Sequence, residues 1–348
     1  MDAPLLGTAL HAAGATCAAC CYTPQRKIRE WSWQTFWIVQ ALICWLIAPL
    51  VGAWLTIPEL GAVLHEAPAR AMWTTYALGV AYGVGGTCFG LAIRYVGFSL
   101  TYAVAIGVSC VLGTITGPIL RGELMALFSK AGADWILAGL LVGVLGIAFC
   151  GMAGRMKELD MSNADGEFSI AKGLPLCLIA GVLSAVYGIA INDTALPIVE
   201  LAGKHGAGEW RTNVAYIFSN SGAFTTTALY CLYLMKKEGT FREFLPTAAR
   251  PRPILIANYA LAFLTGMLWY GQFLFYGTAH VKMGAFKFVS WALHMIMLIL
   301  ISSLLGIILK EWKACRPRTK WSVAAAIVLL IVSVLAISNG SNIGSAAG

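Results

Sequence analysis

The sequence predicts an all-α membrane protein with about ten transmembrane helices. Apolar stretches, each near the roughly 20 residues that a bilayer-spanning helix requires, follow one another from Leu5 to Ser338 with short polar connectors. The composition agrees, because 59% of the residues are hydrophobic and 11% are charged, whereas soluble domains carry about 25% charged residues. The connectors leave no room for a soluble domain of ordinary size.

The individual spans are defined by hydropathy, with boundaries that hold to a few residues. The chain starts Met-Asp-Ala-Pro and lacks the basic region of a cleaved signal peptide, so we expect the first span to be retained. An even number of spans places both termini on one side of the membrane. The predicted spans are 5–22, 33–56, 71–93, 97–118, 133–153, 173–193, 212–235, 253–276, 285–309 and 320–338.

The distribution of cations predicts which side of the membrane the termini face. Short cytoplasmic loops are enriched in Lys and Arg. Of the 24 such residues, 17 lie in or beside the connectors that follow the odd-numbered spans, and 7 lie on the opposite side. Both termini are therefore expected to be periplasmic, in a bacterial inner membrane. This asymmetry accounts for most of the net charge of +8, and no basic-aromatic module predicts a nucleic-acid partner.

An internal repeat divides the chain into two five-helix halves, 1–172 and 173–348. Phe-Gly-Leu-Ala and a following Gly at 89–97 match Tyr-Gly-Thr-Ala and a following Gly at 276–284, and Glu123 aligns with Glu311. Because each half holds an odd number of spans, the second copy is expected to be inverted. Inverted repeats are typical of secondary transporters, whose site lies near the midplane between the halves.

Several sequence blocks in both halves resemble the L-rhamnose/proton symporter family of the drug/metabolite transporter superfamily. They are ACCYTPQRKIREWSW at 19–33, GLAIRYVG at 90–97, MLWYGQFLFY at 267–276, SWALHM at 290–295 and LKEW at 309–312. The resemblance implies a ten-helix inner-membrane carrier with spans 1, 3, 4, 6, 8 and 9 around a central cavity. The chain departs from the family pattern at Gly86, Cys88 and Lys287, where the family has amides and an acid.

Polar and aromatic side chains inside the spans are the candidates for substrate binding, because polar groups are costly in a membrane. A neutral sugar is held by aromatic faces together with amide and hydroxyl groups rather than by charge. Two alternatives stay open at this point: an interfacial aromatic belt for Tyr276 and Trp291, and helix packing for Asn220. The predicted substrate-binding residues are Trp269, Tyr270, Gln272, Phe273, Trp291, Asn192 and Asn220.

Histidine is the first candidate for proton coupling, because its unperturbed pKa of about 6.5 lies near ambient pH. His11 and His294 lie at similar depths in spans 1 and 9, where each either carries the proton or forms a helix-to-helix hydrogen bond. Asp193, at the end of span 6, is either an acid that exchanges protons with the outside or a solvated helix end. Three further residues are expected to form a gate or rim: Arg94 in a tight turn between spans 3 and 4, His280 and Lys287.

We therefore predict a secondary active transporter, not an enzyme, that imports a deoxyhexose, first of all L-rhamnose, in symport with a proton by alternating access. The expected partners are the sugar, the proton and the bilayer, with no cofactor, and a monomer is sufficient. An exporter or facilitator of another small metabolite is the alternative. A redox enzyme built on Cys17 and Cys20 is more distant, because no second cysteine pair and no hydrolase motif accompanies them.

Overall fold

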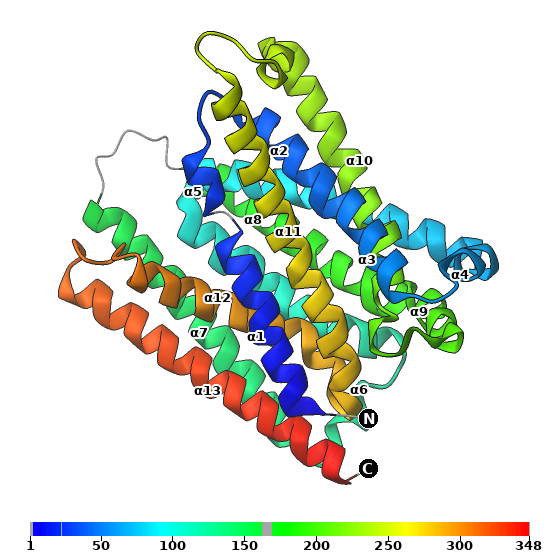
Figure 1. The fold of residues 1–348 in the computed structure, drawn as a ribbon. Coiled ribbons are helices and arrows are strands. Elements are labelled where there is room, and N and C mark those ends of the chain that lie inside the picture. The colour runs from blue at the N-terminus through cyan, green and yellow to red at the C-terminus, as the bar shows by residue number, and fades with distance from the viewer. Residues whose placement is uncertain (1–2, 22, 162–168, 348) are drawn as a thin grey trace.

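The structure is a computed structural model that describes residues 3–21, 23–161 and 169–347. It gives no side-chain detail for six of these residues, Arg94, Gly97, Phe98, Ser99, Met161 and Ala285. Every regular element in the described ranges is helical, and the long helices form one bundle (Figure 1). The first and last helices run side by side, where the Thr8 and Ser338 hydroxyls lie 2.9 Å apart. The prediction of an all-α fold is confirmed.

The long helices follow the predicted spans. Several of these helices have a proline in their first turn, where the backbone N–H that proline lacks would have no partner within the helix. The second span is interrupted by a π-helical turn at Ile43–Ile47. Short helices α4 (Leu60–Glu66), α6 (Leu124–Phe128) and α9 (Leu196–Ala202) were not predicted. The long helices are α1 (Pro4–Cys20), α2 (Trp33–Leu42) with α3 (Ala48–Thr56), α5 (Ala69–Leu120), α7 (Ala133–Met161), α8 (Ile170–Ile189), α10 (Asn213–Glu238), α11 (Arg252–Lys282), α12 (Ser290–Ile308) and α13 (Pro317–Ala347).

Predicted spans 3 and 4 are the two arms of the single helix α5. The rings of Phe89 and Tyr102 lie 5.0 Å apart, whereas 13 residues of straight helix would separate them by about 20 Å. α5 therefore turns back on itself between these residues. The predicted turn between spans 3 and 4 is therefore present, but the backbone at Arg94 stays helical through it, because no proline lies between the arms to end the helix. The side chain of Arg94 lies outside what the structure describes.

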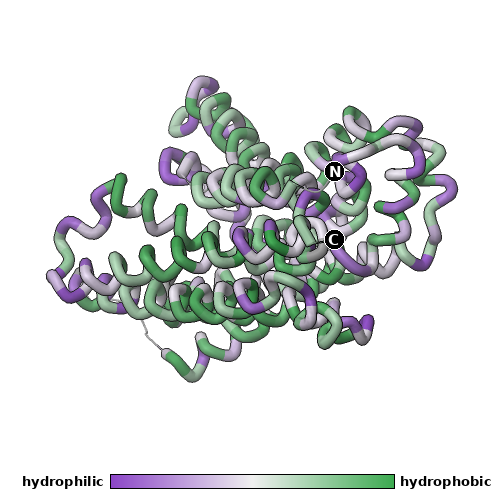
Figure 2. The backbone as a smooth tube through the Cα atoms, turned by 90° about the horizontal axis from the view of Figure 1, so that it is seen from below, coloured by the Kyte–Doolittle hydropathy of each residue, from purple (hydrophilic) through white to green (hydrophobic). Residues whose placement is uncertain are grey.

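Nine helical segments of the described chain are long and apolar enough to cross a membrane, one fewer than expected. The missing segment is α10, whose Ser, Asn and Thr residues lower its hydropathy. These polar residues face inward: Asn213, Ser219, Asn220 and Thr227 are buried. Figure 2 shows apolar residues along the helices and hydrophilic ones mainly at the connectors. The chain is therefore a multi-pass membrane protein with nine candidate spans.

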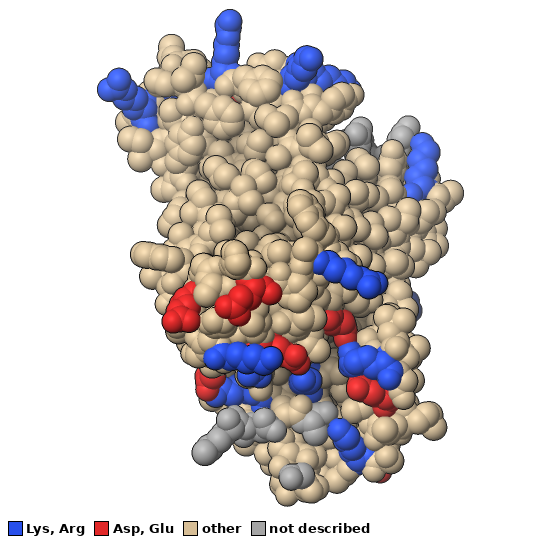
Figure 3. All heavy atoms as spheres, turned by 90° about the vertical axis from the view of Figure 1, so that its right-hand side faces the viewer, with Lys and Arg blue, Asp and Glu red and all other residues tan. Residues whose placement is uncertain are grey.

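Ion pairs between connectors identify the segments that share a side of the bundle. Glu311, after α12, pairs with Arg26 before α2 at 3.0 Å and with Lys157 of α7 at 2.9 Å. At the other end, Arg121 pairs with Asp193. The face in Figure 3 carries Lys and Arg at its upper end and acids with cations in its lower half, with an uncharged band across most of the area between. This grouping agrees with the connectors predicted to face the same side.

Small residues allow the helices to approach closely, as expected where lipid surrounds the bundle. α5 and α10 cross at Gly79 and Gly222, each of which lies directly against the backbone of the other helix. α7 and α13 also approach closely, since a Cβ added at Gly139 would lie 3.0 Å from the backbone nitrogen of Ile337. The bundle is therefore held by backbone-to-backbone packing that larger side chains would prevent.

We expect Gly79→Ala to destabilise the protein, because its Cβ would overlap the backbone carbonyl of Ser219. Overpacking of this kind costs about 1–3 kcal/mol. The measurement is thermal unfolding in detergent, with Gly61→Ala as the control, since nothing lies within 4 Å of a Cβ at Gly61. Equal stability of the two variants would contradict the close crossing.

His205 forms a pH-dependent contact at the end of the bundle where the termini lie. Its ring nitrogens lie 2.9 Å from Glu59 and 3.2 Å from Glu66, and these carboxylates raise the pKa of His205. A raised folded-state pKa means that the stabilisation is fully present below the ordinary value of about 6.5 and is lost as pH rises through the folded value. The stability difference between wild type and His205→Ala, measured by thermal unfolding, should therefore shrink with rising pH; a constant difference would contradict the charged contact.

Candidate functional site

A cavity of about 600 Å³ lies in the centre of the bundle, within the roughly 300–1,000 Å³ typical of small-molecule sites. It is bounded by the expected spans and also by the second span, which the sequence analysis had not included. Aromatic residues are numerous in its wall. The aromatic lining residues are Trp33, Trp37, Trp45, Tyr82, Phe89, Tyr102, Trp269, Phe273, Tyr276 and Trp291.

Three tryptophans form one wall of the cavity. The ring of Trp269 lies 5.7 Å from Trp37 and 5.8 Å from Trp45, nearly perpendicular to both. Trp33 stacks on Trp37 at 5.0 Å. Trp45 lies in the π-helical turn of the second span, an irregularity that is frequent at functional sites. Sequence analysis missed Trp33, Trp37 and Trp45, although the i, i+4 spacing of the first two indicated a common helix face.

Five of the predicted site residues line the cavity: Trp269, Gln272, Phe273, Trp291 and His294. Trp291 donates a hydrogen bond from Nε1 to Ser109 Oγ at 3.1 Å. It is 4% exposed, and Tyr276 is 1% exposed. Such burial does not fit an interfacial aromatic belt, in which the rings face lipid and headgroups. Both residues therefore belong to the interior.

Three predicted substrate-binding residues lie outside the lining. Tyr270 packs beside Gly52 of the second span. Asn220 is fully buried and accepts a hydrogen bond from the Tyr187 hydroxyl, a contact that fits the packing alternative. Asn192 lies in a π-helical turn, Ala190–Thr194, that follows α8. It donates from Nδ2 to the Tyr276 hydroxyl at 2.8 Å.

Three histidines gather around Tyr276 at the closed end of the cavity: His11 and His294 from predicted spans, and His280 from the predicted rim. His11 is fully buried, and its ring centroid lies 5.8 Å from His294 and 5.4 Å from Tyr276. His280 stacks on Tyr276 at 6.0 Å. In the part of the chain that the structure describes, neither ring nitrogen of His11 has a hydrogen-bond partner. Buried polar atoms without a hydrogen-bond partner are rare in proteins, and they indicate a functional requirement or hydration of the site.

Charged residues close the bundle beyond this histidine cluster. Asp193 is half-buried and pairs with Arg121, which also bonds Glu123 at 2.8 Å. Lys282 at the end of α11 pairs with Glu209. Lys287 is exposed in the segment Gly284–Val289 that precedes α12. The cavity is therefore sealed at the end where the termini lie.

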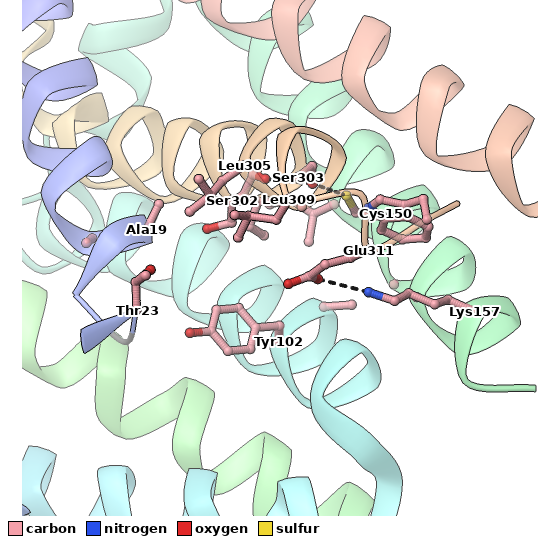
Figure 4. A pocket seen from close by; sticks show the side chains of 18 of the residues that line it. Ala19, Thr23, Tyr102, Cys150, Lys157, Ser302, Ser303, Leu305, Leu309 and Glu311 are labelled. Atoms are coloured by element: carbon pink, nitrogen blue, oxygen red, sulfur yellow. Dashed lines mark hydrogen bonds and ion pairs between the residues drawn. The ribbon is translucent and has the colours of Figure 1, made fainter. Parts of the chain in front are cut away.

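The opposite end of the cavity is open. There its lining includes the exposed side chains of Arg26, in the connector after α1, and Trp33, the first residue of α2. A smaller cavity of about 210 Å³ adjoins it and shares Ala18, Arg26 and Tyr102 with it. Figure 4 shows Glu311 and Lys157 paired beside Tyr102 in this smaller cavity.

Glu311 is the carboxylate that pairs with Arg26 and Lys157 at this open end. Its partial burial favours the neutral acid, but hydrogen bonds from Lys157 and Arg26 hold the pKa of Glu311 below its ordinary value. The carboxylate therefore stays ionised between two cations. Glu123 and Glu311, aligned by the internal repeat, form ion pairs at opposite ends of the bundle.

Within the described ranges, the cavity has no features of a metal or redox centre beside it. Cys17 and Cys20 are both free thiols. Among the residues whose placement is described, no group of three or more His, Cys, Asp or Glu is arranged to hold a metal ion. The site consists of aromatic faces, a few polar groups and a buried histidine cluster.

This fold and site define a multi-pass membrane protein with a central cavity for a small molecule. The family described as L-rhamnose-proton symport protein matches residues 1–347. The chain is 31% identical over 345 residues to an L-rhamnose-proton symporter of Cronobacter sakazakii, covering 98% of this chain and 99% of the relative. It is 32% identical over 351 residues to one of Yersinia pestis, covering 99% of both. The chain belongs to the L-rhamnose-proton symport protein family, a family of transporters rather than enzymes.

Proposed function

We propose that this protein imports L-rhamnose together with a proton by alternating access across the bacterial inner membrane. The observation that carries the proposal is the central cavity, whose aromatic wall ends at a cluster of buried histidines. The full-length similarity to proteins named L-rhamnose-proton symporters supports the same function. The protein acts without a cofactor and as a monomer in this proposal.

The chemistry of the cavity suits a neutral deoxysugar. Trp37, Trp45 and Trp269 present aromatic rings to the cavity, which can cover the apolar face and the methyl group of the sugar. Gln272 provides an amide for the hydroxyl groups. Arg26 lies at the open mouth rather than in the depth of the cavity, so charge is not the basis of recognition.

The histidine cluster is the proposed proton site. His294 lines the cavity, whereas His11 lies directly behind it. Because like charges at this distance repel, one proton shared by the pair is more favourable than two. Asp193, on the sealed side, is proposed to exchange the proton with the periplasm. The sugar and the proton thus bind within one connected region.

The orientation follows from the cations. The open end of the cavity lies among the cation-rich connectors, which are expected to face the cytoplasm, so the conformation is proposed to be open to the inside with both termini periplasmic. His280 and Lys287 then belong to the closed outer rim. Arg94 is proposed to gate the inner mouth, and its side chain lies outside the described residues.

We propose that α10 is the tenth span and that 1–172 and 173–348 are inverted repeats in a drug/metabolite transporter-like fold. The helix contacts support this symmetry. α1 packs against α11 and α12, as α8 packs against the two arms of α5. α7 and α13, the last long helices of the two halves, pack against each other. Exchange of the halves converts the contacts of α1 into those of α8 and maps the α7–α13 contact onto itself.

Substitution of Trp45 tests the sugar site. Trp45→Ala should weaken L-rhamnose binding about tenfold or more, because truncation of a buried aromatic anchor costs on the order of 2 kcal/mol. The control is Trp54→Ala, in the same span but 71% exposed on the bundle surface. Binding is measured by calorimetry on purified protein. Equal affinities of the two variants would place the sugar elsewhere.

Proton symport is tested by external pH in a lightly buffered, de-energised suspension of expressing cells. Addition of L-rhamnose should make the medium more alkaline, and His11→Gln or His294→Gln should abolish this signal. A panel of other deoxyhexoses, pentoses and amino acids tests the substrate. Sugar uptake without alkalinisation would instead indicate a facilitator, and no response to any compound would favour an exporter.

A further inference from the structure

Tyr276 occupies the junction between the cavity and the histidine cluster. Its ring centroid lies 5.4 Å from both His11 and His294, and 5.6 Å from Trp291. It lines the cavity and yet is 1% exposed. Tyr276 therefore forms part of the closed floor against which a bound sugar would rest, and it touches the groups proposed to carry the proton.

The hydroxyl of Tyr276 joins this floor to the ion pair at the sealed end. Asn192 donates to it at 2.8 Å, and the next residue, Asp193, pairs with Arg121. Both residues belong to the π-helical turn Ala190–Thr194. Gly117 of α5 leaves the space for Asp193, since a Cβ there would lie 2.9 Å from both carboxylate oxygens. One short turn thus contacts both the histidine cluster and the outer ion pair.

We propose that the Asn192–Tyr276 hydrogen bond is the link that couples the histidine cluster and the sugar cavity to the Arg121–Asp193 ion pair. This inference rests on the proposed function and assigns Tyr276 and Asn192 as positioning residues within it. The sequence analysis had left Tyr276 open between an interfacial belt and the interior, and had predicted Asn192 as a substrate contact.

The physical basis is the change in hydrogen-bonding capacity when a histidine takes up a proton. A neutral imidazole has one nitrogen that can accept a hydrogen bond from the Tyr276 hydroxyl, whereas both nitrogens of a protonated imidazole are donors. A charged His11 or His294 therefore competes with Asn192 for the tyrosine oxygen. Loss of the Asn192 contact frees the π-helical turn, and with it the carboxylate of Asp193.

The charged and titratable groups around the link come from several elements. His11 belongs to α1, His280 to α11 and His294 to α12, while Asp193 and Arg121 lie on the sealed side. Because these elements come from both halves of the chain, a change at the link can move the halves relative to each other. A contact within one helix could not do so.

The test uses purified full-length protein in proteoliposomes, with Tyr276→Phe and Asn192→Ala as the variants. Two rates are compared: L-rhamnose exchange at equal pH, which needs no net proton movement, and accumulation driven by an imposed pH gradient. In both variants the ratio of gradient-driven accumulation to exchange should fall at least about fivefold, the lower range of typical coupling between sites. The double variant should be no worse than either single one.

Tyr216→Phe is the matched control. Tyr216 is a fully buried tyrosine whose hydroxyl donates one hydrogen bond, to the Phe273 carbonyl at 2.8 Å, and it does not line the cavity. This variant should keep both rates. Retained accumulation in Tyr276→Phe and Asn192→Ala, or an equal fall of exchange and accumulation, would overturn the link. A wild-type protein that exchanges L-rhamnose but never accumulates it would overturn the proposed function as well.

Discussion

The cost of burying polar groups in an apolar bundle is the constraint on which the structure depends. Membrane helices satisfy their own backbone hydrogen bonds, so each buried polar side chain must find a partner or serve a purpose. Asn220 satisfies its amide oxygen through Tyr187 in the packed interior. His11 has no such partner for its ring nitrogens within the described chain, and it lies beside the cavity floor. The ring nitrogens of His11 thus remain without a described partner at the position where the cavity ends.

The helices of the bundle are held together by two kinds of contact, close packing at glycines and ion pairs between connectors. Glycine contacts bring α5 against α10 and α7 against α13 without polar groups. Ion pairs of the described residues join connectors at the two ends of the bundle, among them those of Glu311 at one end and Arg121 at the other. Such pairs can break and form again as water reaches either end, whereas the glycine contacts hold helices together as rigid units. Alternating access requires both kinds of contact.

Much of the helical architecture was predictable from the sequence, because a span is a local property of length and hydropathy. The predicted all-α fold and the grouping of connectors at two ends agree with the structure. The errors have local causes. The polar residues of α10 lower its hydropathy although they face inward, and the bend of α5 contains no helix-breaking proline.

The sequence by itself determined the class of protein, since composition and the recurring apolar spans admit only a membrane bundle. It also identified His11, His294, Gln272 and Trp269 as unusual residues in such a bundle. Only the tertiary structure decided that Trp37 and Trp45 of the second span share a wall with Trp269, and that Tyr276 joins the histidines to Asn192. These contacts connect segments far apart in the chain, and helix periodicity fixes which residues share a face of one helix but not which helices meet.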